Sequence, residues 1–194
     1  IARAADALRE VTHQRDIALV IEAHVLMVER LGLDGGHLTD GARSVRKTRA
    51  DLGADAIGLV FWAGSKRAVT ALDAKALCAE LAPFVTVTAL LVNAGEDEVA
   101  ALIEALPINM LQFHGDEPPA FCEQWPLPYI RALRAEPGAD LMAQAAMYPR
   151  ARGFFLDAVH QGQFGGTGTA FDWALVPKAF GRPLILAGGL NPAN

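Results

Sequence analysis

The chain has 194 residues, of which 52% are hydrophobic and 20% are charged, and its formal net charge is -5. This length suits one domain with a sizeable core, and the negative charge argues against a nucleic-acid partner, which would require a basic face. No apolar run approaches the roughly 18 residues that cross a bilayer, so we expect no membrane partner. The two cysteines, Cys78 and Cys122, lie far apart in helical-looking segments, which predicts no disulfide framework and a reducing cytoplasm.

The predicted elements alternate along the chain between short apolar runs and amphipathic segments. A leading helix is expected over residues 2–14. Apolar runs of about five to eight residues then predict strands, at residues 17–23, 33–38, 56–61, 85–92, 109–114, 129–133, 153–158 and 183–188. Helices are predicted between them, including segments 42–53, 72–82, 96–106 and 118–125. The chain opens on Ile rather than Met and stops just after a turn signal, so we expect it to be incomplete at one or both ends.

This alternation predicts a parallel sheet covered by helices, because strands that are buried on both faces read as nearly continuous apolar runs. Eight strands is the number that closes a (β/α)8 barrel, the TIM barrel, although 194 residues lies just below the usual length of that fold. No final helix is predicted, and the leading helix would cover the seam in its place. The alternative is an open, doubly wound sheet. We therefore predict one α/β barrel domain over residues 1–194.

Polar side chains gather at the predicted strand ends, which is where barrels collect their functional residues. The candidates there are Lys66, Arg67, Asn93, Gln112, His114, Arg131, Arg134 and Asp157. Residues two apart share a face of a strand, so Gln112 and His114 are expected to lie together. Asp157 is the strongest candidate, because an acid that ends a strongly apolar strand costs desolvation unless it is paired or used.

Two glycine-rich turns follow the last two predicted strands. Segment 165–168 reads Gly-Gly-Thr-Gly, whose backbone N–H groups can approach an anion as closely as those of phosphate-binding loops. Gly188 and Gly189 offer a second such turn ahead of an expected helix start. Plainer interpretations stay open: a flexible loop for the glycines, a hydrogen-bonded structural role for His114, and solvated or paired side chains for the arginines.

Six stretches of the sequence together resemble one known family, in that family's order. They are LGADAIGLVFWAGSKRAV, FVTVTALLVNA, INMLQFHGDEPPAFC, YIRALR, FFLDAVHQGQFGGTGTAFDW and PLILAGGLNPAN. From about residue 50 to residue 194 the chain resembles the phosphoribosylanthranilate isomerase family. The resemblance implies a (β/α)8 barrel that uses no metal or organic cofactor and acts on a small phosphorylated substrate. The implied reaction belongs to tryptophan biosynthesis: the Amadori rearrangement of an N-(5-phosphoribosyl)anthranilate aminoaldose into the aminoketose.

The resemblance also implies roles for the residues that match the family's motifs. Asp157 matches the general acid that protonates the ribose ring oxygen as the ring opens. Arg67 matches the arginine that holds the anthranilate carboxylate, a contact suited to guanidinium geometry. Gln112 and His114 match polar residues on the floor of the site. The residues that match loops near the substrate phosphate are Gly165, Gly166, Thr167, Gly168, Gly188 and Gly189.

The first 50 residues depart from this family. Its first strand ends in Lys-Ile-Cys-Gly, and that cysteine is the general base that removes the C2 proton; this stretch is absent here, as is the family's eighth strand. Cys78 and Cys122 are not expected to replace the base, because both lie in predicted helices. His37, which ends the second predicted strand, is the expected substitute, with Asp40 as the second choice. An imidazole with a pKa of about 6.5 is largely neutral and basic at pH 7, although a structural histidine is the plainer interpretation.

Residues 1–50 instead faintly resemble thiamine-phosphate synthase, another phosphate-binding barrel. Asp34 and His37 match its GADGVHL-like stretch, but Glu22-Ala23 stands where that family carries its Asn-Asp metal pair, so transferase activity is not expected. We predict a hybrid barrel in which two foreign strands replace the isomerase's first and eighth, as a monomer or homodimer. Without the cysteine the isomerase activity is expected to be impaired. The alternative is a non-catalytic barrel that keeps weak phosphate binding.

Overall fold

The computed structural model describes residues 17–22, 35–37, 56–81, 83–136, 138–157, 177 and 180–187 of the chain. At residues 17–22, 35–37, 157, 186 and 187 it describes the backbone. The chain divides into two compact units. Unit 1 comprises residues 1–37 and 131–194, and unit 2 comprises residues 38–130.

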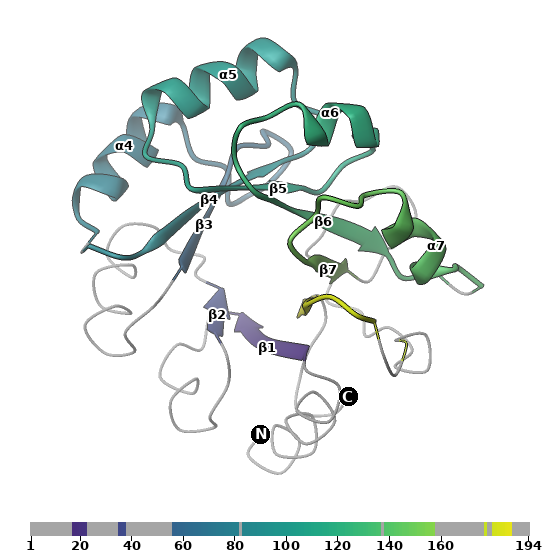
Figure 1. The fold of residues 1–194 in the computed structure, drawn as a ribbon. Coiled ribbons are helices and arrows are strands. Elements are labelled where there is room, and N and C mark those ends of the chain that lie inside the picture. Colours follow the sequence, from purple (N-terminus) through teal and green to yellow (C-terminus); the bar gives the residue numbers. More distant parts are fainter. Residues whose placement is uncertain are drawn as a thin grey trace. The chain divides into compact units, whose positions relative to one another are not determined.

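Unit 1 contains a parallel sheet built from both ends of the chain (Figure 1). Its strands are β1 (Ile17–Glu22), β2 (Gly35–His37), β6 (Tyr129–Arg134), β7 (Phe154–Asp157) and β8 (Leu184–Ala187). They lie in the order β2-β1-β8-β7-β6, and the pairings from β2 through to β6 are all parallel. The first two residues of β6, Tyr129 and Ile130, belong to unit 2.

The pairing of β1 with β8 distinguishes the two predicted architectures. Ile17 pairs with Leu184 and Leu19 with Leu186, so the first strand of the chain is hydrogen-bonded beside the last one described. In an open doubly wound sheet the first strand lies beside other early or middle strands, whereas a barrel brings first and last strands together. The pairing of β1 with β8 therefore favours the barrel over the open, doubly wound sheet.

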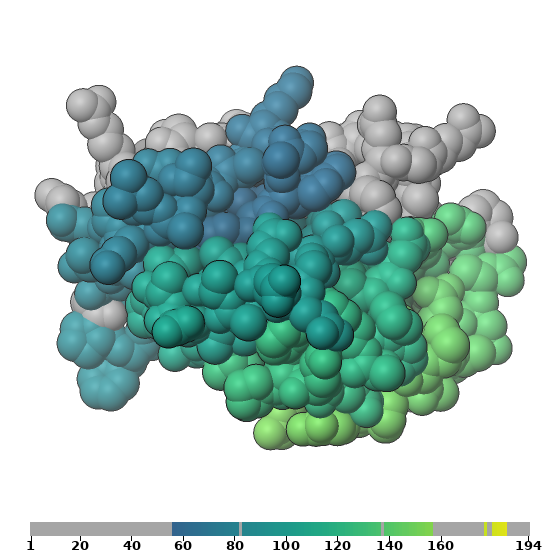
Figure 2. Space-filling model, turned by 90° about the horizontal axis from the view of Figure 1, so that it is seen from above, coloured from purple at the N-terminus to yellow at the C-terminus, as the bar shows by residue number. Residues whose placement is uncertain are grey.

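Unit 2 holds three parallel strands covered by helices. The strands are β3 (Ala56–Val60), β4 (Thr86–Leu91) and β5 (Met110–Phe113), in the order β5-β4-β3, and the helices are α4 (Ala71–Ala79), α5 (Glu96–Ala105) and α6 (Pro119–Glu123). Figure 1 shows the three helices on one side of these strands. Seen from above, the blue and teal atoms of the segments that contain α4 and α5 form much of the visible surface of unit 2 (Figure 2).

The core of unit 2 lies between this sheet and its helices. The strand register aligns Leu59 with Ala89 and Ala89 with Leu111, and all three side chains are buried. The helices add the buried residues Ala74, Leu77, Val99 and Leu102. Each large aliphatic side chain removed from water in this way contributes about 1.5–3 kcal/mol, so burial of this face explains why the segment folds with its helices on one side.

Short polar residues set where the helices begin. The hydroxyl oxygen of Thr70 accepts a hydrogen bond from the N–H of Asp73 at 3.1 Å, which satisfies one of the free N–H groups at the start of α4. Asp140 does the same for α7 (Leu141–Ala146), accepting from the N–H of Ala143 at 2.9 Å. Helix α6 begins at Pro119, whose fixed φ suits a first helical position.

All eight predicted strands are present; seven are shorter than their predicted ranges, and β6 extends one residue beyond its range. Helices α5 and α6 fall within predicted helical segments, α4 begins one residue before its predicted segment, and α7 was not among the predicted helices. The helices predicted over residues 2–14 and 42–53 lie outside the described residues. The secondary structure that the sequence predicts for the described part of the chain is therefore confirmed.

Candidate active site

The loop after β3 holds Arg67 through its backbone. The N–H of Arg67 donates to the hydroxyl oxygen of Ser65 at 3.1 Å, and the N–H of Ser65 donates to the carbonyl of Trp62 at 2.9 Å. Gly64 packs so closely against the indole of Trp62 that an added Cβ would collide with the ring. Arg67 thus follows β3 on a compact turn and has a half-buried side chain, as expected of a residue at the carboxyl end of a barrel strand.

Gln112 and His114 lie together at the end of β5. Phe113, between them, packs edge-on against Phe121 of α6, with ring centroids 5.9 Å apart, so its neighbours occupy the sheet face away from the helices. The side-chain nitrogen of Gln112 lies 3.1 Å from Nδ1 of His114. An amide nitrogen only donates, so in this arrangement Nδ1 accepts and the ring carries its proton on Nε2. This contact orients the imidazole ring just after β5.

A buried carboxylate connects the ends of β4 and β5, and the sequence analysis did not single it out. Glu117 is 4% exposed and accepts hydrogen bonds from the N–H of Asn93 at 2.7 Å and of Gly115 at 3.0 Å. The Asn93 side chain in turn accepts from the N–H of Asp116 at 2.6 Å. The available signal was an acid four residues after a buried strand, immediately before two prolines that fix a helix start.

The strand ends of unit 1 place Asp157 beside Arg134. In the register of the parallel sheet, Asp157 is the partner of Arg134 on β6 and of Ala187 on β8. His37, the last residue of β2, is likewise the register partner of Glu22, the last residue of β1. Because all these strands are parallel, each of these positions lies at the carboxyl end of the unit 1 sheet.

The register also places positions 37 and 157 on one face of this sheet. Position 37 is the register partner of Glu22, and Glu22 lies on the same face of β1 as Ala18. Ala18 is the register partner of Ile185 on β8, and Ile185 is in turn the partner of Phe155 on β7. Positions two apart lie on the same face, so 155 and 157 do as well. The candidate base and the candidate acid therefore occupy the same face and the same end of the unit 1 sheet.

Arg131 does not belong with the rim residues. Its side chain is 7% exposed, and its guanidinium carbon lies 5.0 Å from the ring centroid of Tyr148, just after α7. In the register its partner on β7 is Phe154, which packs against Phe180. Arg131 therefore occupies the sheet face opposite that of position 157, where its guanidinium lies over the Tyr148 ring rather than facing the candidate site.

Some of the remaining candidates lie outside the described residues, and the others are divided between the two units. Residues 165–168, 188 and 189 fall outside them, as does Asp40. Arg67, Gln112 and His114 belong to unit 2, whereas His37 and Asp157 belong to unit 1. The prediction that Arg67, Gln112, His114 and Asp157 gather at the strand ends of one barrel concerns both units together and stays a prediction.

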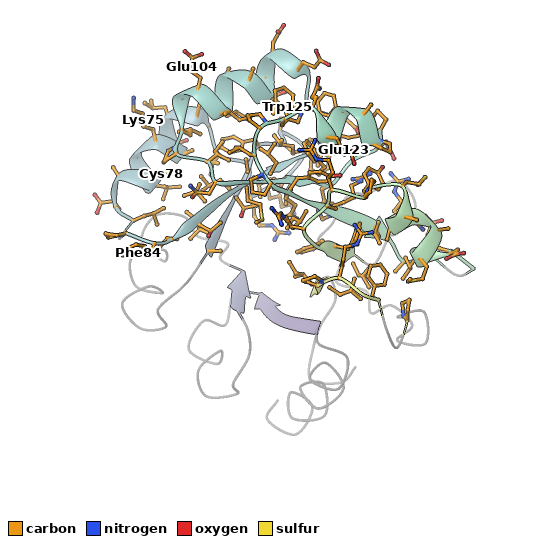
Figure 3. All side chains as sticks on the ribbon, in the orientation of Figure 1. Lys75, Cys78, Phe84, Glu104, Glu123 and Trp125 are labelled. Atoms are coloured by element: carbon orange, nitrogen blue, oxygen red, sulfur yellow. The ribbon has the colours of Figure 1, made fainter. Side chains whose placement is uncertain are left out.

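Both cysteines lie in helices, as predicted. Cys78 is half-buried near the end of α4 (Figure 3), and burial raises the pKa of its thiol above the ordinary value. Cys122 is fully buried in α6. Among the described residues, no three His, Cys, Asp or Glu side chains meet in a way that would hold a metal ion. No described helix is long and apolar enough to cross a membrane.

In the described part of the chain, the parallel strands, the polar residues at their carboxyl ends and the pairing of β1 with β8 are features of a (β/α)8 barrel. Residues 39–194 match the family model of N-(5'-phosphoribosyl)anthranilate (PRA) isomerase. The chain belongs to this family, and the match begins at residue 39, ahead of the stretch from about residue 50 that resembles the family in sequence.

Curated relatives of the same name cover most of this chain. The PRA isomerase of Pseudomonas fluorescens SBW25 is 53% identical over 144 residues, which are 74% of this chain and 69% of the relative. That of Pseudomonas putida W619 is 54% identical over 145 residues, 75% of this chain and 70% of the relative. That of Azotobacter vinelandii DJ is 53% identical over 145 residues, with the same coverage of 75% and 70%.

Solved structures of the family share the fold. The PRA isomerase of Thermus thermophilus superposes with a TM-score of 0.66 at 27% identity, over 92% of this chain and 80% of its own. That of Thermotoga maritima gives a TM-score of 0.67 at 26% identity, with the same coverage of 92% and 80%. A third, with a TM-score of 0.63 at 25% identity over 92% of this chain and 78% of its own, is a complex with reduced 1-(o-carboxyphenylamino)-1-deoxyribulose 5-phosphate. The predicted barrel class is confirmed.

Proposed function

We propose that this chain is a PRA isomerase of tryptophan biosynthesis, converting the N-(5-phosphoribosyl)anthranilate aminoaldose into the aminoketose. The observation that carries the proposal is family membership over residues 39–194, supported by relatives of that name at 53–54% identity. The solved relative that binds a reduced 1-(o-carboxyphenylamino)-1-deoxyribulose 5-phosphate supports a phosphorylated ligand of this kind.

Asp157 is proposed to begin the reaction as general acid. Its carboxyl gives a proton to the ribose ring oxygen, the bond from C1 to that oxygen breaks, and the anthranilate nitrogen lone pair forms a C1=N bond. A base then removes the C2 proton, and the C2–H electron pair forms a C1=C2 bond while the C1=N π electrons return to the nitrogen. The resulting enolamine tautomerises to the ketone. Only proton transfers are needed, so the proposed chemistry calls for no metal or organic cofactor.

His37 is the proposed base in place of the family's cysteine. The register supports this, because position 37 shares the face and the carboxyl end of the unit 1 sheet with position 157. A neutral imidazole near pH 7 accepts a proton readily. The opposite outcome, a barrel that binds phosphate without turnover, is the second candidate function, and it is favoured by the absence of the family's Lys-Ile-Cys-Gly stretch from the sequence.

Substrate binding is proposed for unit 2 and for the glycine turns. Arg67 would hold the anthranilate carboxylate through its guanidinium, and the Nε2–H of His114, oriented by Gln112, would donate to a substrate oxygen. Residues 165–168, 188 and 189 would surround the phosphate with backbone N–H groups. We expect a cytoplasmic enzyme, as befits a phosphorylated biosynthetic intermediate, and a monomer or homodimer, which light scattering on the purified protein would distinguish.

Turnover by the unmodified chain tests the proposed function directly. Expression in a tryptophan auxotroph that lacks PRA isomerase should restore growth without tryptophan, and purified chain should deplete the fluorescent anthranilate adduct. An auxotroph carrying the empty vector is the control. No growth and no depletion, together with measurable binding of the reduced carboxyphenylamino-deoxyribulose phosphate, would favour the non-catalytic barrel.

A further inference from the structure

We propose that Glu117 is a positioning residue, which fixes the end of β5 against the end of β4 and thereby holds His114 in place to bind the substrate. Glu117 lies four residues after β5 and two before α6, inside unit 2, and its side chain is 4% exposed. The inference deepens the proposed function, from which it takes the substrate-binding role of His114.

The carboxylate of Glu117 bridges two segments that are distant in sequence. One oxygen accepts from the N–H of Asn93, two residues after β4, at 2.7 Å, and the other accepts from the N–H of Gly115, just after β5, at 3.0 Å. Hydrogen bonds to an ionised acceptor are stronger than neutral ones, and here both oxygens are used by backbone donors. A carboxylate provides two acceptors in this geometry, whereas an amide provides one acceptor and one donor.

Asn93 locks the same two segments from the other side. Its side-chain oxygen accepts from the N–H of Asp116 at 2.6 Å. Its backbone has φ of 52°, a left-handed conformation that few residues other than glycine adopt and that asparagine tolerates better than most. Gly115 leaves no room for a side chain, because an added Cβ would collide with this oxygen of Asn93. Neither segment can shift without breaking contacts to the other.

His114 lies directly within this connection. Its own N–H donates to the carbonyl of Leu91 at 2.9 Å, and the next residue, Gly115, donates to Glu117. Its ring is oriented by Gln112, whose side-chain nitrogen lies 3.1 Å from Nδ1. The backbone of His114 is thus fixed by the β4 ladder on one side and by the Glu117 carboxylate on the other. Loss of that carboxylate should let the imidazole move relative to its ligand.

If Glu117 served only the stability of the fold, a buried carboxylate would be an unfavourable choice at this position. Replacing buried charges by well-packed apolar groups is often neutral or stabilising, because a charge must be withdrawn from water. A carboxylate, by contrast, joins two backbone donors at defined positions. This favours a geometric role for Glu117 in the site rather than a role in stability alone.

The test compares Glu117→Gln with Glu104→Gln, an exposed glutamate that points away from α5 (Figure 3). Steady-state kinetics on the purified full chain should show kcat/KM about 10- to 100-fold lower for Glu117→Gln, mainly through a higher KM, since small misplacements of a binding group have effects of this size. Glu104→Gln should match the parent. In a His114→Ala background, Glu117→Gln should add little, because both changes remove the same interaction.

A spectroscopic measurement keeps this inference separate from the proposed function. In nitrogen-15 spectra of the folded protein, Glu117→Gln should shift the backbone signals of Asn93 and Gly115 and the ring signals of His114, and Glu104→Gln should not. If the parent lacks activity, the proposed function fails while these shifts still report the connection to His114. Unchanged His114 signals, or additive losses in the double variant, would overturn the positioning role, as would an unchanged KM with only a lower melting temperature.

Discussion

Asp157 occupies a position in which an acid has a use. It ends an apolar strand, it is the register partner of Arg134 on β6, and it shares a sheet face with position 37. The proposed reaction needs this residue to deliver a proton, so its removal should affect the chemical step more than binding.

Asp157→Asn should lower kcat by about 100- to 10,000-fold, the usual range for one positioned acid or base, with little change in KM. His37→Ala should lower kcat in the same range if the imidazole is the base. The measurement is depletion of anthranilate-adduct fluorescence, with Asp97→Asn on the exposed first turn of α5 as the matched control. If Asp157→Asn keeps the activity of the parent, Asp157 is not the general acid. If His37→Ala keeps the activity of the parent, His37 is not the base.

Cys78 should react slowly as a nucleophile, although its side chain is only half-buried. Burial raises the pKa of its thiol, so at any given pH near neutrality less of it is thiolate than in an unshielded cysteine. Alkylation by iodoacetamide, followed by mass spectrometry, should therefore be slower at Cys78 than in a small free thiol, and should accelerate as the pH rises through the alkaline range. Cys78→Ser should abolish this labelling in the folded protein, because Cys122 is fully buried. Rapid labelling of Cys78 at neutral pH would contradict the expectation.

Among the helices, α7 depends on an arginine far along the chain. One terminal nitrogen of Arg182 donates to the carbonyl of Tyr148 at 2.9 Å, and the other donates to the carbonyl of Ala145 at 3.1 Å. The guanidinium also lies over the ring of Phe154, 4.7 Å from its centroid. A cation at the carboxyl end of a helix satisfies free carbonyls and complements the helix dipole. Arg182 thus ties α7 to β7 and to the segment before β8.

Arg182→Ala should lower the free energy of unfolding by about 2 kcal/mol, since it removes charge-assisted hydrogen bonds and a cation–π contact together. Arg152→Ala, an exposed arginine between α7 and β7, should change it by less than about 0.5 kcal/mol. Urea unfolding followed by circular dichroism measures both. Equal stabilities for the two variants would show that the Arg182 contacts contribute nothing net.

The sequence predicts the strands well and some contacts poorly, for physical reasons. Parallel strands that are buried on both faces read as continuous apolar runs, so β3 and β4 are evident from their composition. Helix α7 is only six residues long, too short for its periodicity to stand out from the surrounding polar segment. Strand periodicity pairs Gln112 with His114, and the contact between them confirms it.

Two site features depend on information that periodicity does not contain. Arg131 and Arg134 are three apart and so lie on opposite faces of β6, but the sequence does not say which face the helices cover. The packing of Arg131 against Tyr148 decides it. Glu117 receives its N–H donors from segments before it, one of them 24 residues away, so its burial becomes visible only in three dimensions.

For the chain as a whole, the joining of its two ends in unit 1 should be visible in hydrogen exchange. β1 is hydrogen-bonded to β8 and to β2 in one sheet, although about 160 residues separate β1 from β8 along the chain. The amides of β1 and β8 should therefore show similar protection and lose it at the same denaturant concentration. Exchange of β1 at the rate of an unstructured peptide, with β8 still protected, would contradict this.

The position of β1 also has a consequence for solubility. β8 reads Leu-Ile-Leu-Ala, and β1 occupies the side of it that faces away from β7. If β1 detached, β8 would present a row of unpaired N–H and C=O groups on an apolar strand, a template for pairing with another molecule. β1 thus shields the chain from intermolecular sheet formation, and conditions that release it should produce aggregates before the rest of the molecule unfolds.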